Sequence, residues 1–186
     1  IHNPRPLGFG ANHNQAFARV ASPFFCVLNP DMRLRDPGLW AQMLAAVQSQ
    51  VGPADVFIAT AAVADWRPAN MADQKIKKDG SGEVPTLSFV ENPDILAGVA
   101  APGPNRPALV IGFAAETTDL EANARAKLSR KGCDWILGND VSDDVFGSDG
   151  NAVLLVTADK TETWPRQSKT AIARAVAARI ADHFKA

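Results

Sequence analysis

The stretch ALVIGFAAETTDLEANARAKLSRKGCDWIL, residues 108–137, carries the pattern that decides the fold. It opens with a continuous apolar run over 108–113, which is typical of a buried strand. A polar segment of helix-favouring residues follows and ends at Gly132, a residue type that commonly stops a helix. A second apolar strand, 134–137, comes directly afterwards. Apolar strands that alternate with helices indicate a parallel sheet covered on both faces.

The same alternation extends in both directions along the chain. Upstream, strands are predicted over 24–28, 55–61 and 86–90, and helices over 12–20, 36–47 and 92–100. Downstream, 152–157 and 160–164 resemble a β-hairpin, and a closing helix runs to Phe184. The expected helix caps include Asp36, Thr118 or Asp119, and Ser168. The sequence therefore predicts an α/β fold, in which ligands bind beyond the carboxyl ends of the strands.

Composition narrows the class of protein. The 186 residues carry a formal net charge of −1, which gives no electrostatic case for a nucleic-acid or membrane partner. No apolar run reaches the ~18 residues of a membrane span, and no signal peptide is recognised, so a cytoplasmic location is expected. Cys26 and Cys133 each lie in a hydrophobic run, which favours two buried thiols over a disulfide.

Small and acidic residues follow the strand predicted over 55–61. Ala61 and Ala62 are small enough for a ligand to approach the backbone closely, and Asp65 then presents a carboxylate to a ribose or a metal. An Asp after a strand is also a common turn former, so the pattern leaves both interpretations open. Phe113 ends the strand of 108–113, where it suits either a base-stacking role or the core.

Two groups of lysines are candidates for binding phosphate. Lys75, Lys77 and Lys78 lie in a polar segment over 65–83 that is long for a loop. They form either a solvated face or a cationic lid that excludes water when it closes. Lys127 and Lys131 are four residues apart, which places them on one face of a helix.

The helix predicted over 92–100 begins with Asn92, Pro93, Asp94, Ile95 and Leu96. Its free N–H groups are able to donate to a base or a phosphate, although Pro in a first turn also marks an ordinary helix start. The three histidines show no metal-ligand spacing, and neither a Walker motif nor a nucleophile-elbow motif is present.

The order of these motifs resembles one family. AAVADWRP, QKIKK, ENPDIL, VIGFAAET, ARAKLSRKGCDWILGNDVS and FGSDGNAV occur in the order expected of phosphopantothenate–cysteine ligase. That ligase is the carboxyl-terminal domain of the bifunctional coenzyme A biosynthesis flavoprotein. The resemblance runs from about Leu44 to Phe184 and implies a Rossmann-like, mostly parallel sheet with helices on both faces and a carboxyl-terminal β-hairpin.

The resemblance also implies a reaction and a site. The family joins 4′-phosphopantothenate to cysteine with CTP and Mg²⁺ through an acyl-cytidylate, and its members generally form homodimers. Lys75 is the expected catalytic lysine, supported by Lys77 and Lys78. The expected nucleotide contacts are Ala61, Ala62, Asp65, Lys75, Pro93, Asp94, Ile95, Leu96, Phe113, Lys127 and Lys131.

The amino-terminal segment departs from this family. Upstream of Leu44 the expected Arg-x-x-x-Asn-x-x-Ser-Gly segment is absent. Residues 3–34 instead resemble a fragment of rhamnosyltransferase-type glycosyltransferases, in which Asp31 of Asn-Pro-Asp would hold a divalent metal. We therefore expect a glycosyltransferase-like segment over 1–43, packed on or replacing the first ligase unit, and a CTP-binding ligase domain over 44–186. An inactive chimeric fold is the main alternative, and nucleotide-sugar transfer is a further one.

Overall fold

The computed structural model describes residues 24–27, 39–60, 63–70, 80, 86–141 and 150–185. The strands are β1 (Phe24–Val27), β2 (Val56–Ala59), β3 (Trp66–Pro68), β4 (Phe89–Glu91), β5 (Leu109–Glu116), β6 (Trp135–Asp140), β7 (Gly150–Thr157) and β8 (Thr161–Ser168). The helices are α2 (Leu39–Val51), α3 (Ile95–Ala100), α4 (Leu120–Lys131) and α5 (Lys169–His183). Within these ranges no helix combines the length and the apolar character that a membrane crossing requires.

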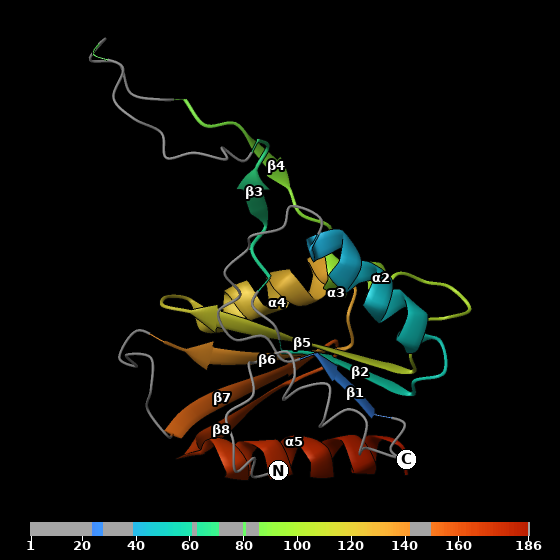
Figure 1. Ribbon diagram of the computed structural model, residues 1–186. Helices are drawn as coiled ribbons and strands as arrows, with labels where there is room; N and C mark the ends of the chain where they lie inside the picture. Colours follow the sequence, from blue (N-terminus) through green and yellow to red (C-terminus); the bar gives the residue numbers. More distant parts are fainter. Residues whose placement is uncertain are drawn as a thin grey trace, which may run out of the picture.

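A six-stranded sheet in the order β1-β2-β5-β6-β7-β8 forms the centre of the molecule (Figure 1). The pairs β1–β2, β2–β5 and β5–β6 are parallel, whereas β7 and β8 form an antiparallel hairpin against β6. Helices α2, α3 and α4 lie on one face of the sheet and α5 lies on the other (Figure 1). The mostly parallel α/β sheet, the two helical layers and the terminal hairpin that the sequence predicted are confirmed.

Alternate side chains of the strands enter two apolar cores. On β5, Val110 and Ala114 belong to the core beneath α2, α3 and α4, whereas Leu109 and Ile111 belong to the core beneath α5. This period of two is the one a strand imposes. Because both faces are covered, β5 is apolar along most of its length instead of alternating with polar residues.

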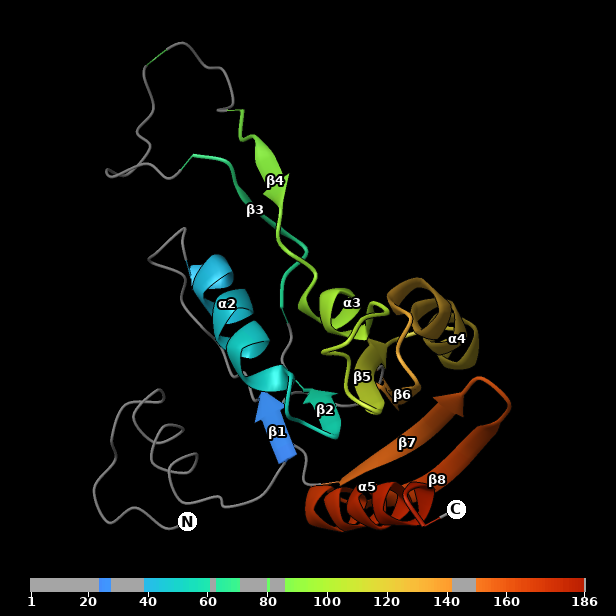
Figure 2. The same ribbon diagram turned by 90° about the vertical axis from the view of Figure 1, so that its right-hand side faces the viewer.

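A small antiparallel sheet of β3 and β4 projects from the main body as an arm (Figures 1 and 2). The sequence predicted only a loop over 65–83, and that prediction is wrong for β3. The strand is three residues long and ends in Pro68, so it has neither the length nor the alternation that marks a strand. The predicted strand 86–90 is present as β4, shifted toward Glu91.

The helix starts differ in how they are capped. Ser168 caps α5 as predicted, because its hydroxyl accepts a hydrogen bond from the Ala171 N–H at 3.2 Å. Asp119 precedes α4 as predicted, but its side chain makes no capping hydrogen bond and its φ is 48°. Gly132 ends α4 in the left-handed conformation, as expected of a glycine stop.

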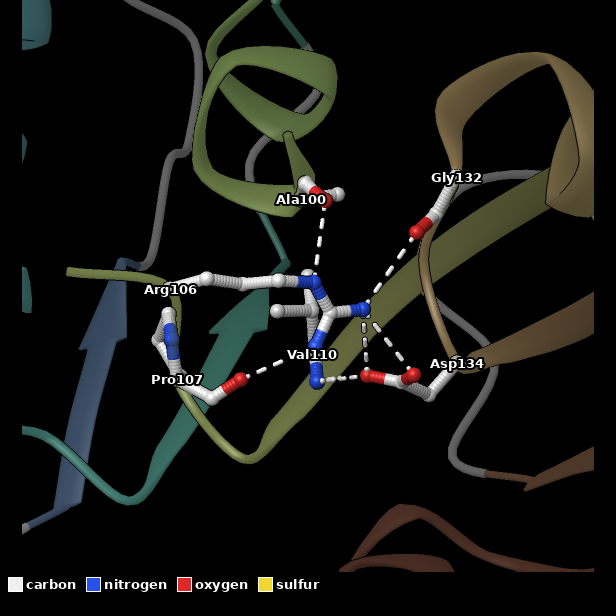
Figure 3. Close-up of polar contacts among 6 residues, drawn as sticks. All are labelled: Ala100, Arg106, Pro107, Val110, Gly132 and Asp134. Atoms are coloured by element: carbon white, nitrogen blue, oxygen red, sulfur yellow. Dashed lines mark hydrogen bonds and ion pairs between the residues drawn. The ribbon is translucent and has the colours of Figure 1, made fainter. Parts of the chain in front are cut away.

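An arginine ties the ends of two helices to the sheet (Figure 3). Arg106 donates through Nε to the Ala100 carbonyl at the end of α3, at 2.9 Å, and through Nη2 to the Gly132 carbonyl after α4, at 3.4 Å. The same Nη2 reaches both carboxylate oxygens of Asp134, at 2.9 and 3.0 Å. Asp134 in turn accepts the Val110 N–H at 2.7 Å. Arg106 and Asp134 therefore fix α3 and α4 relative to β5.

Candidate functional site

A pocket of about 530 Å³ lies beyond the carboxyl end of β2 and beside β5, with residues of α2, α3 and α4 in its walls. Its lining residues are Met43, Phe57, Ala59, Val63, Ala64, Asp65, Trp66, Glu91, Asn92, Pro93, Asp94, Ile95, Leu96, Phe113, Lys127, Arg130 and Lys131. This is the edge at which a parallel sheet binds ligands. Parallel strands place their carboxyl ends together, so segments distant in the sequence meet here.

The pocket gathers eight of the residues that the sequence assigned to a nucleotide site. These are Asp65, Pro93, Asp94, Ile95, Leu96, Phe113, Lys127 and Lys131. Ala61, Ala62, Lys75, Lys77, Lys78 and Asp31 lie outside the described residues. These eight residues are spread over positions 65–131 of the chain, and the fold brings them together in one pocket.

The start of α3 differs in detail from the prediction. Pro93 precedes the helix and does not lie in its first turn, where the sequence had indicated it. Asp94 is the N-cap, and its Oδ1 accepts the Ala97 N–H at 3.0 Å. Asp94 Oδ2 also accepts a hydrogen bond from Lys131 Nζ. Desolvation raises the pKa of Asp94, but the Ala97 N–H and Lys131 together outweigh it and leave that pKa below its usual value.

Lys127 is a half-buried cation in the pocket wall. Desolvation is the largest cause that lowers its pKa, and repulsion from Lys131 adds to the effect. Glu116 and, more weakly, Asp65 act in the opposite direction. The pocket therefore contains ammonium charge that an anionic ligand would stabilise.

Phe113 lines the pocket while its ring packs against the core beneath α5. Next to it, Gly112 allows α3 to approach the sheet closely: a Cβ at this position would lie 2.6 Å from Leu96 Cδ2 and 2.9 Å from Ile136 Cδ1. Leu96 is itself a wall of the pocket. A glycine in β5 thus sets how near the start of α3 comes to the strand ends.

Nine of the lining residues were not assigned to the site from the sequence, and Arg130 and Asn92 are among them. Arg130 is adjacent to the expected Lys131, but the i, i+4 spacing of lysines indicates only Lys127 and Lys131. Asn92 belongs to the quoted motif ENPDIL, yet nothing in the sequence marks it as buried. In the structure it is only 6% exposed and hydrogen-bonds to the loop after β2.

No cluster of His, Cys, Asp or Glu able to hold a metal ion by itself is found among the described residues. Three acidic residues, Asp65, Glu91 and Asp94, line the pocket, and both oxygens of Asp94 accept hydrogen bonds. Cys133 is buried and free, as the sequence predicted, and burial raises the pKa of its thiol to about 11. A thiol of such pKa is a poor nucleophile at neutral pH.

The family model of the DNA/pantothenate metabolism flavoprotein C-terminal domain matches residues 32–184, which is most of the chain. The chain belongs to this flavoprotein C-terminal domain family. The match begins upstream of Leu44, so the family includes residues that the sequence analysis placed in the amino-terminal segment.

Relatives in this flavoprotein C-terminal domain family are proteins of coenzyme A biosynthesis. The coenzyme A biosynthesis bifunctional protein CoaBC of Vibrio cholerae is 47% identical over 137 residues, covering 73% of this chain and 34% of that protein. The Escherichia coli K12 protein of the same name is 39% identical over 176 residues, covering 90% of this chain and 43% of that protein. The chain therefore spans less than half the length of these relatives.

A solved structure supports the flavoprotein C-terminal domain fold. The crystal structure of the C-terminal domain of a coenzyme A biosynthesis bifunctional protein CoaBC superposes with a TM-score of 0.59 at 28% identity. It covers 86% of this chain and 70% of that chain. The fold of this solved structure therefore agrees with the family match and with the α/β architecture described above.

Proposed function

We propose that this chain is a CTP-binding phosphopantothenate–cysteine ligase module of coenzyme A biosynthesis. The observation that carries the proposal is the gathering of Asp65, the start of α3, Phe113, Lys127 and Lys131 around one pocket at the strand ends. The relatives add the pathway, because they are bifunctional proteins of coenzyme A biosynthesis.

The proposed first half-reaction forms an acyl-cytidylate. An oxygen of the 4′-phosphopantothenate carboxylate attacks the α-phosphorus of CTP, the bond from that phosphorus to the bridging oxygen breaks, and pyrophosphate leaves. Negative charge develops on phosphoryl oxygens, so cations positioned around them lower the barrier. Lys127 and Lys131 are suited to neutralise the triphosphate, and Lys75 is the proposed catalytic lysine with Lys77 and Lys78 beside it in the sequence.

The proposed second half-reaction makes the amide. The cysteine amine attacks the acyl carbon, the carbon–oxygen bond to CMP breaks, and the nitrogen loses a proton. In this step the pocket would bind and orient the cytidine part of the acyl-cytidylate. Asp65 offers a carboxylate to ribose hydroxyls, and the N–H groups at the start of α3 offer donors to the base.

Magnesium fits this pocket as a partner of the nucleotide. Mg²⁺ is usually bound by one or two carboxylates together with substrate phosphates and water. Asp65 and Glu91 line the pocket and would be the carboxylates to hold such an ion, since both oxygens of Asp94 already accept hydrogen bonds. Bound with CTP, the ion would neutralise phosphate charge.

Two assays test the proposal. Isothermal titration with CTP and Mg²⁺ is expected to give saturable binding, and Lys127→Gln is expected to weaken it. Lys185 is an exposed lysine after α5 that pairs with Asp182, so Lys185→Gln is the control and is expected to leave binding unchanged. Pyrophosphate release from CTP and 4′-phosphopantothenate is expected to require Lys75. The absence of heat at millimolar CTP would reject nucleotide binding. Binding without pyrophosphate release would favour the inactive chimeric fold.

The amino-terminal segment is proposed to complete the sheet and not to act as a separate enzyme. β1 is paired in parallel with β2 over four residues. The Escherichia coli relative also aligns with 90% of the chain, more than the part from Leu44 onward. Sugar transfer remains the alternative for Asp31: activity lost in Asp31→Ala but kept in Lys75→Gln would favour it.

We further propose a cytoplasmic homodimer that uses the arm of β3 and β4. The exposed apolar side chains here are Trp66 (61%), Phe89 (55%) and Val90 (37%) on the arm and Leu87 (54%) just before β4. An isolated two-stranded sheet is marginally stable, and exposed apolar groups in such a number favour a protein interface. Neither nucleic acid nor a membrane is needed as a partner.

A further inference from the structure

Asn92 is the buried polar residue at the junction of the arm and the pocket. It is 6% exposed, and no other polar or charged residue in the described ranges is buried. Enclosing an amide costs free energy unless its donors and acceptors find partners. An apolar residue would fill the same space without that cost. The polar side chain therefore calls for an explanation in terms of what it connects.

Asn92 is hydrogen-bonded to three residues of one segment far from it in the sequence, residues 64–67. Its Nδ2 donates to the Ala64 carbonyl at 2.7 Å, and its backbone N–H donates to the Asp65 carbonyl at 2.7 Å. Its Oδ1 accepts from Arg67 Nη1 at 2.8 Å. The same nitrogen of Arg67 donates to the Glu91 carbonyl at 2.9 Å.

These contacts join the two walls of the pocket. Ala64 and Asp65 form the wall that follows β2, and Pro93 to Leu96 form the wall that opens α3. Asn92 immediately precedes the second wall and bonds to both residues of the first. Hydrogen bonds of fixed direction from a buried group permit one relative placement of the two walls, whereas apolar packing permits several.

We propose that Asn92 and Arg67 are positioning residues of the nucleotide pocket. They hold the Asp65 carboxylate at a fixed separation from the N–H groups at the start of α3, so that ribose and base are bound together. The inference rests on the proposed nucleotide-binding function. Since Arg67 belongs to β3, it also links the shape of the pocket to the orientation of the arm.

The first test measures CTP affinity by titration calorimetry in Arg67→Gln, Arg67→Lys and Asn92→Ala. Arg67→Gln and Asn92→Ala are expected to raise Kd about tenfold or more, as expected when a buried amide loses its partner. Arg67→Lys keeps a charged donor and is expected to fall between Arg67→Gln and the parent. Arg179→Gln, which loses a comparable bond to Glu162 on the α5 side, is the matched control and is expected to bind normally.

A double-mutant cycle with Asp65 distinguishes positioning from general loosening. If Arg67 acts through Asp65, then Arg67→Gln in an Asp65→Ala background is expected to change Kd by less than about threefold. A residue that merely stabilised the fold would give fully additive effects in the cycle. Full additivity, or parent-like affinity in both Arg67→Gln and Asn92→Ala, overturns the proposal while leaving CTP binding by the parent intact.

Amide hydrogen exchange supplies a readout that needs no nucleotide. Because the Asn92 N–H is bonded to the Asp65 carbonyl, Arg67→Gln is expected to speed its exchange without affecting the N–H groups of β7. If the parent protein binds no CTP, the proposed function fails. Exchange then decides the positioning claim separately: unchanged protection of Asn92 in Arg67→Gln overturns it.

Discussion

Lys127 combines burial, positive charge and positive neighbours, which is an unfavourable position for an ammonium group in the unliganded protein. Desolvation and repulsion from Lys131 lower its pKa below 10.5. Binding of a polyanion favours the charged form, so the affinity for CTP is expected to fall as pH rises through this lowered pKa. In Lys127→Arg the guanidinium stays charged, so calorimetry is expected to show a smaller loss of affinity as the pH is raised from neutral toward 10.5.

The same position carries a prediction for stability. The unfolded chain binds the Lys127 proton more tightly than the folded one, so the charged side chain destabilises the fold at neutral pH. This cost is lost as pH rises from the lowered pKa toward 10.5. Lys127→Met is therefore expected to raise the melting temperature at neutral pH while weakening CTP binding. A melting temperature that falls in Lys127→Met would contradict the assignment of this lysine as a strained, functional cation.

Gly112 gives a prediction that concerns distance and not charge. An added Cβ would meet Leu96 at 2.6 Å and Ile136 at 2.9 Å. Both contacts are with side-chain methyl groups, so Gly112→Ala is expected to displace the start of α3 at a cost of about 1–2 kcal/mol. CTP affinity is expected to fall with it, because Leu96 lines the pocket. Gly98→Ala, where a Cβ meets nothing within 4 Å, is the control in both calorimetry and urea denaturation.

For single residues of the site, the sequence could indicate those that follow a strand or begin a helix, but not the polar residues that become buried. Asp65 and Phe113 were found because the carboxyl ends of parallel strands share one edge. Asn92 lies in a polar stretch, where an amide is ordinarily exposed. Asn92 is buried because the pairing of β3 with β4 brings residues 64–67 against it, and no local sequence pattern predicts that pairing.

Among the elements, α3 and α4 depend on Arg106 and Asp134 for their placement (Figure 3). The ion pair measures 2.9 Å, with side chains 22% and 34% exposed. Arg106→Met is expected to lower the free energy of unfolding by roughly 2 kcal/mol, because several hydrogen bonds to charged groups are lost. Urea denaturation measures this loss. The exposed pair of Arg125 and Glu121 is the control, since Arg125→Met is expected to cost much less.

Continuous apolar runs and helix caps decided which elements could be predicted. β5, β6 and the closing helix α5 were expected because apolar runs and caps mark them. β3 was not, since three residues ending in proline contain too little pattern, and its existence depends on pairing with β4. β8 was predicted to end at Trp164 but continues to Ser168, because pairing with β7 carries the strand past Pro165.

At the scale of the whole molecule, the arm of β3 and β4 is the feature that the isolated chain leaves uncovered. It projects from the body in both views (Figures 1 and 2). Trp66, Phe89 and Val90 of its strands are 61%, 55% and 37% exposed. Pairing of two arms would cover them. It would also brace Arg67, which bonds to Asn92 beside the pocket. Assembly and nucleotide binding are therefore expected to be coupled.

Phe89→Asp tests this coupling, because it places a charge on the exposed face of the arm without touching the pocket lining. Sedimentation velocity is expected to show a shift from dimer to monomer, and CTP affinity is expected to fall because Arg67 loses its support. Phe184→Ser removes an equally prominent ring, 49% exposed, at the end of α5 and serves as the control. A Phe89→Asp protein that remains dimeric would place the interface elsewhere on the molecule. One that becomes monomeric with unchanged CTP affinity would separate assembly from the nucleotide pocket.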